Sequence, residues 1–160
     1  GAADLGLVDG LAAPSDPLRL PDVAPLGVRG LAEGPVAVLL AEDHPLARRP
    51  GLRLGDLVDA RWIDAPDTGL PLARLRAASG TSGFRPAVRY DGTDLRTLTA
   101  LVAAGHGLAL LPRWAAEEAR GTVAVPLTAP RVVHRTELLH TGTLRGPART
   151  LAAQLDVTRS

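Results

Sequence analysis

The sequence predicts an α/β fold with a largely parallel sheet. Short apolar runs, bounded by glycine, proline or charged residues, alternate along the chain with segments that carry apolar residues at helical spacing. Hydrophobic residues fill 46% of the 160 positions, which is enough to build a core without disulfides or metal ions. The chain is therefore expected to be a globular α/β protein.

The first forty residues are expected to hold two strands. Residues 4–9 form a short apolar run, and residues 36–41 form a continuous one, as in a strand buried on both faces. Residues 10–33 contain four prolines and alternating apolar positions. This composition excludes a long helix and favours extended, irregular connecting chain.

Helices and strands then alternate to the C-terminus. The helix at 93–105 has the clearest signals, because Thr93 or Asp94 can cap its start and Gly105 can end it. The other expected elements are a short helix around 52–58, a strand at 62–65, a helix at 70–79, strands at 87–90 and 107–112, a helix at 114–120, strands at 123–127 and 132–140, and a helix at 146–155. The long strands at 36–41 and 132–140 flank the middle block and could carry the chain into and out of a second lobe.

Composition excludes several classes of function. The net charge is +1, and the basic residues, all of them arginine, form no stripe of the kind that nucleic acid requires. Without cysteine there is no disulfide scaffold, thiolate metal site or cysteine nucleophile. No apolar run has the length of a membrane span and no leader segment is present, so a cytoplasmic location is expected. The absence of Met leaves room for elements N-terminal to Gly1 in a parent protein.

Six short strings occur in an order and spacing that are specific when taken together. They are ADLGLV at 3–8, VLL followed by HPLA at 38–47, LGDL followed by WI at 54–63, GFRP at 83–86, TD at 93–94 and LVAAGHGLALLP at 101–112. This series resembles the effector-binding domain of LysR-type transcriptional regulators. HPLA and LVAAGHGLALLP carry most of the weight.

The resemblance implies two Rossmann-like lobes joined by two crossing strands, similar to type II periplasmic binding proteins, with a small-molecule effector in the cleft between them. It assigns residues 1–41 and 136–160 to lobe one and residues 42–135 to lobe two. Family members carry a winged helix-turn-helix, a linker helix and the start of lobe one before the ADLGLV strand. Lobe one is therefore expected to be truncated at its N-terminus, with DNA bound only through a missing N-terminal domain. A homo-oligomer, a homodimer in the family, is also expected.

Ligand-binding residues are expected at the carboxyl ends of strands, where ligands collect in open α/β sheets. The residues at these ends are Asp9, Asp67, Thr68, Gly69, Thr93, Leu111 and Pro112. Thr68 and the amides near Gly69 could hold a carboxylate effector at a helix N-terminus, whereas Asp9 would favour a donor or positive group. The resemblance also implies that Thr68 and Asp9 contact the effector. The alternative is structural: Thr68 or Thr93 caps a helix and Asp9 closes a turn.

No catalytic, metal or cofactor site is expected. The histidines at 44, 106, 134 and 140 form no HxH or HExxH pair, and residues 80–83 lack both the GxSxG pattern and a P-loop lysine. An aromatic content of 2% argues against a stacking platform in the cleft. The chain is therefore interpreted as a sensing domain and not as an enzyme. A periplasmic-type solute-binding protein with the same two-lobed architecture is the alternative.

Overall fold

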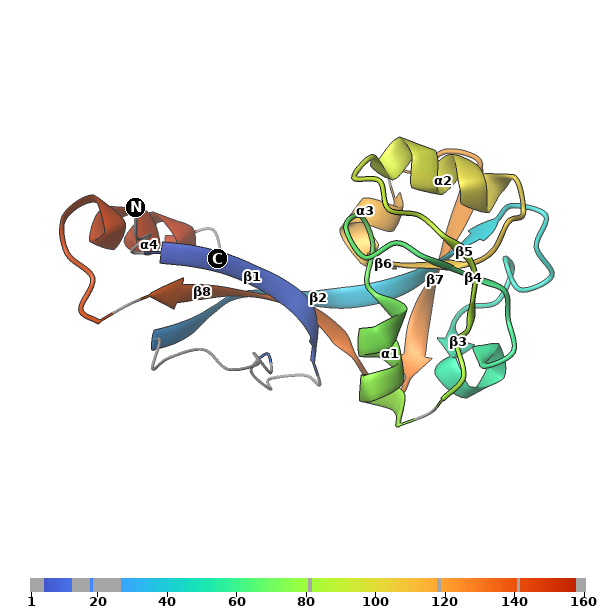
Figure 1. The fold of residues 1–160 in the computed structure, drawn as a ribbon, viewed down its shortest axis with the longest axis horizontal. Helices are drawn as coiled ribbons and strands as arrows, with labels where there is room; N and C mark the ends of the chain where they lie inside the picture. The colour runs from blue at the N-terminus through green and yellow to red at the C-terminus, as the bar shows by residue number, and fades with distance from the viewer. Residues whose placement is uncertain are drawn as a thin grey trace.

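The computed structural model describes residues 5–12, 18, 27–80, 82–117, 119–140 and 142–157. In chain order, its elements are β1 (Leu5–Ala12), β2 (Gly27–Ala41), β3 (Leu52–Arg53), the 3-10 helix η1 (Leu54–Leu57), β4 (Trp62–Asp64), α1 (Leu72–Ser79), β5 (Pro86–Arg89), α2 (Leu95–Ala103), β6 (Ala109–Pro112), α3 (Arg113–Glu117), β7 (Thr122–Ala129), β8 (Val133–His140) and α4 (Gly146–Val157). They form two parts of an elongated molecule (Figure 1). We call the part with β1, β8, α4 and the first half of β2 lobe one, and the remainder lobe two.

Strand β2 runs through both lobes. Its first half, 27–35, pairs with β8, and its second half lies between β6 and β7. The main sheet has the order β1-β8-β2-β7-β3, with β6 also paired to β2, and β4 pairs with β5 in a separate sheet. Strand β2 pairs with β8 up to Pro35 and with β6 from Val36 onward, so this one continuous strand places the start of β8 close to the end of β6.

The largely parallel sheet predicted from the alternation of elements is wrong for the main sheet. The pairs β1–β8, β8–β2, β2–β6 and β2–β7 are antiparallel. Among the described residues, parallel pairing is confined to β3–β7, β4–β5 and an isolated bridge between Trp62 and Leu108. The reason is the route of the chain: β2 enters lobe two and β8 returns from it, so the two run in opposite directions. Helical connections, which parallel strands require, join β4 to β5, β5 to β6 and β6 to β7 within lobe two.

The irregular connection predicted at 10–33 is wrong at both ends. Residues 10–12 belong to β1 and residues 27–33 belong to β2, where they pair with β8 through a bulge between Gly30 and Ala32. The four prolines all lie in the part of the connection outside the described residues. The prediction for the proline-containing part thus lies outside the described residues, and the alternating positions at 27–33 are strand.

Lobe two has a core on each face of its sheet. Along β2, the side chains of Val36, Val38 and Leu40 join one cluster with Trp62, and those of Ala37 and Leu39 join another. This confirms the predicted strand at 36–41 with both faces buried. In lobe one, α4 covers a smaller cluster of Leu31, Leu138 and Ala152. No helix in the described part of the chain is long and apolar enough to cross a membrane.

Candidate functional site

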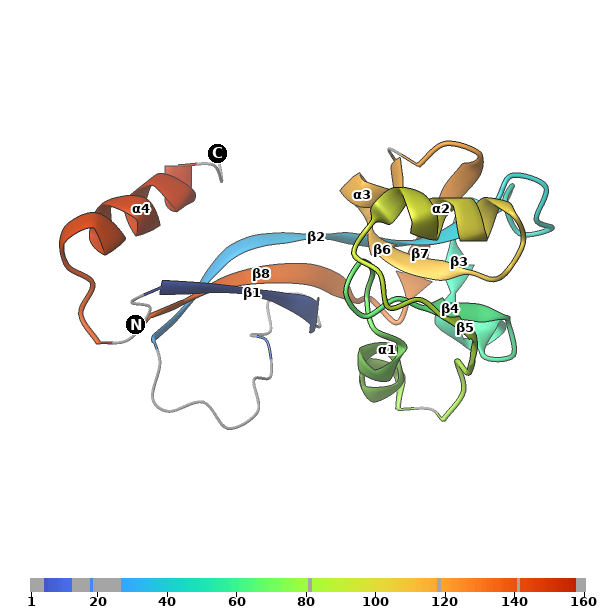
Figure 2. The ribbon, with the colours of Figure 1, turned by 45° about the horizontal axis from the view of Figure 1, so that its top comes forward.

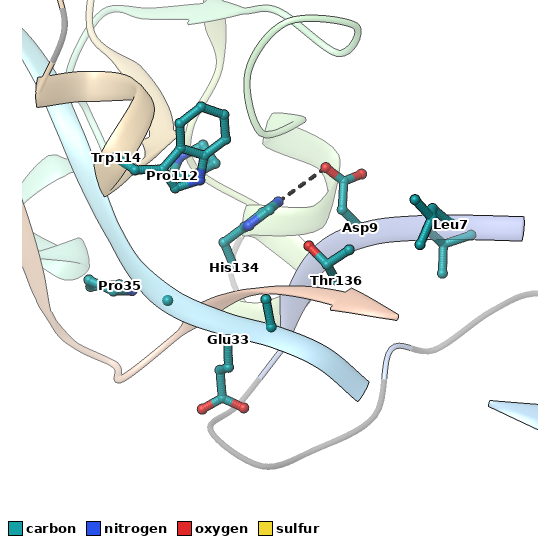
Figure 3. A pocket seen from close by; sticks show the side chains of 11 residues that line it. Leu7, Asp9, Glu33, Pro35, Pro112, Trp114, His134 and Thr136 are labelled. Carbon is teal, nitrogen blue, oxygen red and sulfur yellow. Dashed lines mark hydrogen bonds and ion pairs between the residues drawn. The ribbon is translucent and has the colours of Figure 1, made fainter. Parts of the chain in front are cut away.

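A pocket of about 420 Å³ lies between the lobes (Figure 3). Its lining residues are Leu7, Val8, Asp9, Ala32, Glu33, Gly34, Pro35, Pro112, Trp114, His134 and Thr136. Lobe one contributes β1, β8 and the first half of β2, and lobe two contributes the end of β6 and the start of α3. The volume is in the range of small-molecule sites.

The strand register explains the floor of this pocket. Asp9 lies opposite Thr136, which in turn lies opposite Ala32, and His134 lies opposite Gly34. Residues directly opposite each other in antiparallel strands project from the same face of the sheet. The three strands therefore bring a carboxylate, a hydroxyl and an imidazole together, while Ala32 and Gly34 leave space above the strand.

Asp9 and His134 form a polar pair in the pocket. His134 Nε2 lies 3.1 Å from Asp9 Oδ2, across 125 positions of sequence. The His134 side chain is only 11% exposed, whereas that of Asp9 is 69% exposed. The imidazole thus holds one carboxylate oxygen, and the other has no hydrogen-bond partner among the described residues.

Trp114 is the aromatic ring at the pocket. It lies in the first turn of α3, two residues after the end of β6 at Pro112, and is 66% exposed. Figure 3 shows its indole beside Pro112 and above His134. The expectation that no aromatic platform lines the cleft is wrong, because a low aromatic content says nothing about where the few rings lie. Sequence reasoning missed both His134 and Trp114 as site residues.

Thr68 has a different partner from either one predicted for it. Its Oγ1 donates to the carbonyl of Gly92, which ties the loop after β4 to the loop after β5. Helix α1 starts at Leu72, and the carboxylate of Asp64 accepts a hydrogen bond from the Leu72 amide at 3.1 Å. The prediction that Thr68 caps this helix is therefore wrong.

The amides around Thr68 are already engaged. The Thr68 and Gly69 amides donate to the carbonyl of Ala65 at 3.3 and 2.8 Å, and the Leu70 amide donates to that of Leu110 at 2.9 Å. A carboxylate could use these donors only after the loop releases one of them.

The predicted site residues thus fall into two groups. Asp9 and Pro112 line the interlobe pocket, whereas Asp67, Thr68, Gly69, Thr93 and Leu111 do not. Leu111 is fully buried in the core of lobe two. The helix cap predicted at Thr93 or Asp94 is Asp94, which accepts from the amides of Arg96 and Thr97.

A second contact joins the lobes on the side of the crossing strands that faces away from α3. Figures 1 and 2 show α1 and α3 on opposite sides of β2. From α1, Arg74 Nη1 donates to the backbone carbonyl of Asp9 at 3.1 Å. The guanidinium passes over Gly10, where a Cβ atom would lie 2.0 Å from Nη1. Asp9 therefore presents its carboxylate to the pocket while its backbone is held by lobe two.

A second hollow, of about 720 Å³, lies within lobe two between α2 and the segment that follows α3. Its lining includes Asp94, Arg96 and Arg120. It is the larger of the two, but a ligand bound there would touch a single lobe. Among the described residues, no group of three His, Asp or Glu side chains could hold a metal ion.

The two lobes, the crossing strands and the pocket between them define a periplasmic-binding-protein-like regulatory domain. Residues 1–156 match the family model of the LysR substrate binding domain, and the chain belongs to that family. The resemblance seen in the six sequence strings is confirmed. This is a family of transcriptional regulators and not of enzymes.

Known relatives and structures agree with this assignment. The transcriptional dual regulator GltC of Bacillus subtilis is 33% identical over 100 residues, which are 61% of this chain and 33% of GltC. The regulatory domain of Synechocystis PCC6803 CcmR in complex with 2-PG has a TM-score of 0.70 at 19% identity, over 97% of this chain and 73% of that one. The BenM effector binding domain with its effector benzoate has a TM-score of 0.66 at 19% identity, over 94% and 68% of the two chains. This chain thus spans about one third of its relative GltC.

Proposed function

We propose that this chain is the effector-sensing domain of a LysR-family transcriptional regulator and that its effector binds in the interlobe pocket. The observation that carries the proposal is that both lobes line this pocket, with Asp9, His134 and Thr136 on one side and Pro112 and Trp114 on the other. A ligand there contacts both lobes, so its binding free energy depends on their relative angle. Such a ligand shifts the population of lobe arrangements.

The change of lobe angle is the proposed signal. The continuous strand β2 acts as the hinge, and the hydrogen bond from Arg74 to the Asp9 carbonyl is an interlobe contact that this motion would alter. In a homodimer, a new lobe angle would change the spacing of the DNA-binding domains. Contact with DNA through an N-terminal domain outside this sequence, the homodimer and a cytoplasmic location all belong to this proposal.

Two alternatives have weaker support. A periplasmic-type solute-binding protein would share the fold, but the relatives are transcriptional regulators. A carboxylate effector at the Thr68 loop would fit the benzoate of BenM, yet the amides of Thr68, Gly69 and Leu70 already have partners. A carboxylate would bind there only with a rearranged loop.

The test measures the distance between the lobes during a ligand screen. The chain has no cysteine, so the pair Arg48→Cys in the exposed turn after β2 and Thr150→Cys in α4 can carry fluorescent labels for energy transfer outside both hollows. A bound effector is expected to change the transfer efficiency and to raise the melting temperature by mass action. Ala32→Leu, which fills the pocket floor, is expected to abolish both effects.

Ala100→Leu is the matched control, because it adds the same side chain in the second hollow, beside α2. The contrary outcome is a compound that changes the transfer efficiency and the melting temperature equally in Ala32→Leu and the unmodified chain, but changes neither in Ala100→Leu. That result would show that the effector binds in the second hollow and not in the interlobe pocket. A screen in which bound ligands never change the interlobe distance would contradict the proposed signal.

A further inference from the structure

We infer that the interlobe pocket selects an organic cation, that is, a ligand with an ammonium or amidinium group on an apolar body. This inference rests on the proposed function, because it names the ligand class of the same pocket. It departs from the carboxylate effector predicted from the Thr68 loop.

The charges around the pocket carry the first step. Asp9 and Glu33 are the ionisable acids among its lining residues, and no arginine in the described part of the chain lines it. Glu33 Oε2 accepts from Arg135 Nη1 at 3.0 Å, and in Figure 3 its side chain points away from the other labelled groups. Asp9 is therefore the charged group that a ligand meets, and it attracts a cation and repels a carboxylate.

The pairing of Asp9 leaves it able to bind such a group. His134 holds the Oδ2 atom at 3.1 Å, and the mostly buried imidazole cannot swing away from the strand without losing its packing. The second oxygen of Asp9 stays accessible, since the side chain is 69% exposed. A ligand ammonium can then add a charge-assisted hydrogen bond without displacing the histidine.

The indole of Trp114 supplies the second recognition element. Tryptophan is the aromatic side chain that attracts cations most strongly through its ring face, and this ring is 66% exposed at the pocket. Pro112 adds apolar surface beside it, and Leu7, which is 60% exposed, adds apolar surface to the lining beyond Asp9 (Figure 3). A carboxylate near one wall and an indole near the other fit a ligand with a charged head and an apolar body.

The groups that an anion would need lie elsewhere. The amides of the Thr68 loop are engaged with backbone carbonyls. The exposed guanidinium groups of Arg96 and Arg120 flank a different hollow, the one between α2 and the segment that follows α3. An anionic ligand is therefore expected to prefer that hollow to the interlobe pocket.

The experiment compares benzylammonium with benzoate, two probes that share a phenyl ring and differ in the sign of their charge. Binding to the chain is measured at constant ionic strength by saturation-transfer NMR and by tryptophan fluorescence. Trp62 is fully buried and Trp114 is exposed, so a change on ligand addition reports mainly on Trp114. We expect benzylammonium to bind at least about tenfold more tightly than benzoate, which corresponds to about 1.4 kcal/mol.

Asp9→Asn keeps the shape of the side chain and removes its charge, and it is expected to weaken benzylammonium binding by about tenfold or more. Asp43→Asn is the matched control, because it neutralises an exposed aspartate that does not line the pocket; it is expected to leave the affinity unchanged. Circular dichroism of both variants establishes that they are folded.

Three results would overturn the inference. One is benzoate binding as tightly as benzylammonium, and another is unchanged benzylammonium affinity in Asp9→Asn. The third is no detectable benzylammonium binding at millimolar concentration. Benzoate binding is also measured in Arg120→Ala: benzoate that this substitution releases occupies the hollow beside α2, as expected, and supports the inference, so only benzoate that stays bound counts in the comparison. The proposed function fails separately, if no ligand in the energy-transfer screen changes the interlobe distance.

Discussion

Glu137 in β8 is a fully buried carboxylate, and its replacement tests how lobe one is held together. Its Oε1 accepts hydrogen bonds from Arg135 Nε at 2.6 Å and from the Leu18 amide at 3.1 Å. Arg135 also donates to Glu33 at 3.0 Å. The hydrogen bond to Glu137 raises the pKa of the Arg135 guanidinium, so the guanidinium stays charged. The Oε2 atom of Glu137 has no hydrogen-bond partner among the described residues.

The structure sets the size of the effect. Glu137→Ala removes the acceptor for two donors and leaves Arg135, whose side chain is 17% exposed, with Glu33 as its remaining carboxylate. Breaking a buried pair in this way is expected to lower the free energy of unfolding by about 3–5 kcal/mol. Glu137→Gln keeps an acceptor for Leu18 but loses the charge, for which about 1–3 kcal/mol is expected.

Glu33→Gln is the matched control, because Glu33 binds the same guanidinium from a position that is 32% exposed. Its expected effect is about 0–1 kcal/mol. Urea unfolding followed by circular dichroism measures all three variants on one scale. The reasoning is refuted if Glu137→Gln destabilises the chain no more than Glu33→Gln does.

Three further predictions concern lobe two. Leu72→Ala empties a fully buried position under α1 and should lower the free energy of unfolding by about 2–5 kcal/mol in urea titrations. Thr68→Val removes the hydrogen bond to Gly92, with an expected loss of about 0.5–1.5 kcal/mol, whereas Thr68→Ser should retain it; a Thr68→Val variant that binds the true effector normally would count against a ligand role for Thr68. Hydrogen bonds from the Thr97 hydroxyl and the Arg96 amide lower the pKa of Asp94 below its ordinary value of 3.8. Its cap therefore stabilises α2 above that value and is lost as the pH falls through the lowered pKa, so the melting temperatures of the chain and of Asp94→Ala should converge on acidification.

Local patterns in the sequence were sufficient for several elements. The continuous apolar run at 36–41 predicted a strand buried on both faces, and its residues do join the two cores of lobe two. Asp94 and the apolar spacing that follows it predicted α2 and its cap. The six strings predicted the family. These features are readable because periodicity and capping depend on residues within a few positions of one another.

Which strands pair, and which distant residues meet in the pocket, depended on the tertiary structure. Periodicity tells that a segment is a strand but not which strand lies beside it or in which direction, so the antiparallel sheet around β2 could not be deduced from the alternation of elements. Asp9 and His134 meet across 125 positions, and the second lobe adds Trp114 to the same pocket. The sequence by itself determined most of the strands and helices and the family, but not the first half of β2. The register between distant strands, which sets the face from which each side chain projects, decided which residues form the pocket.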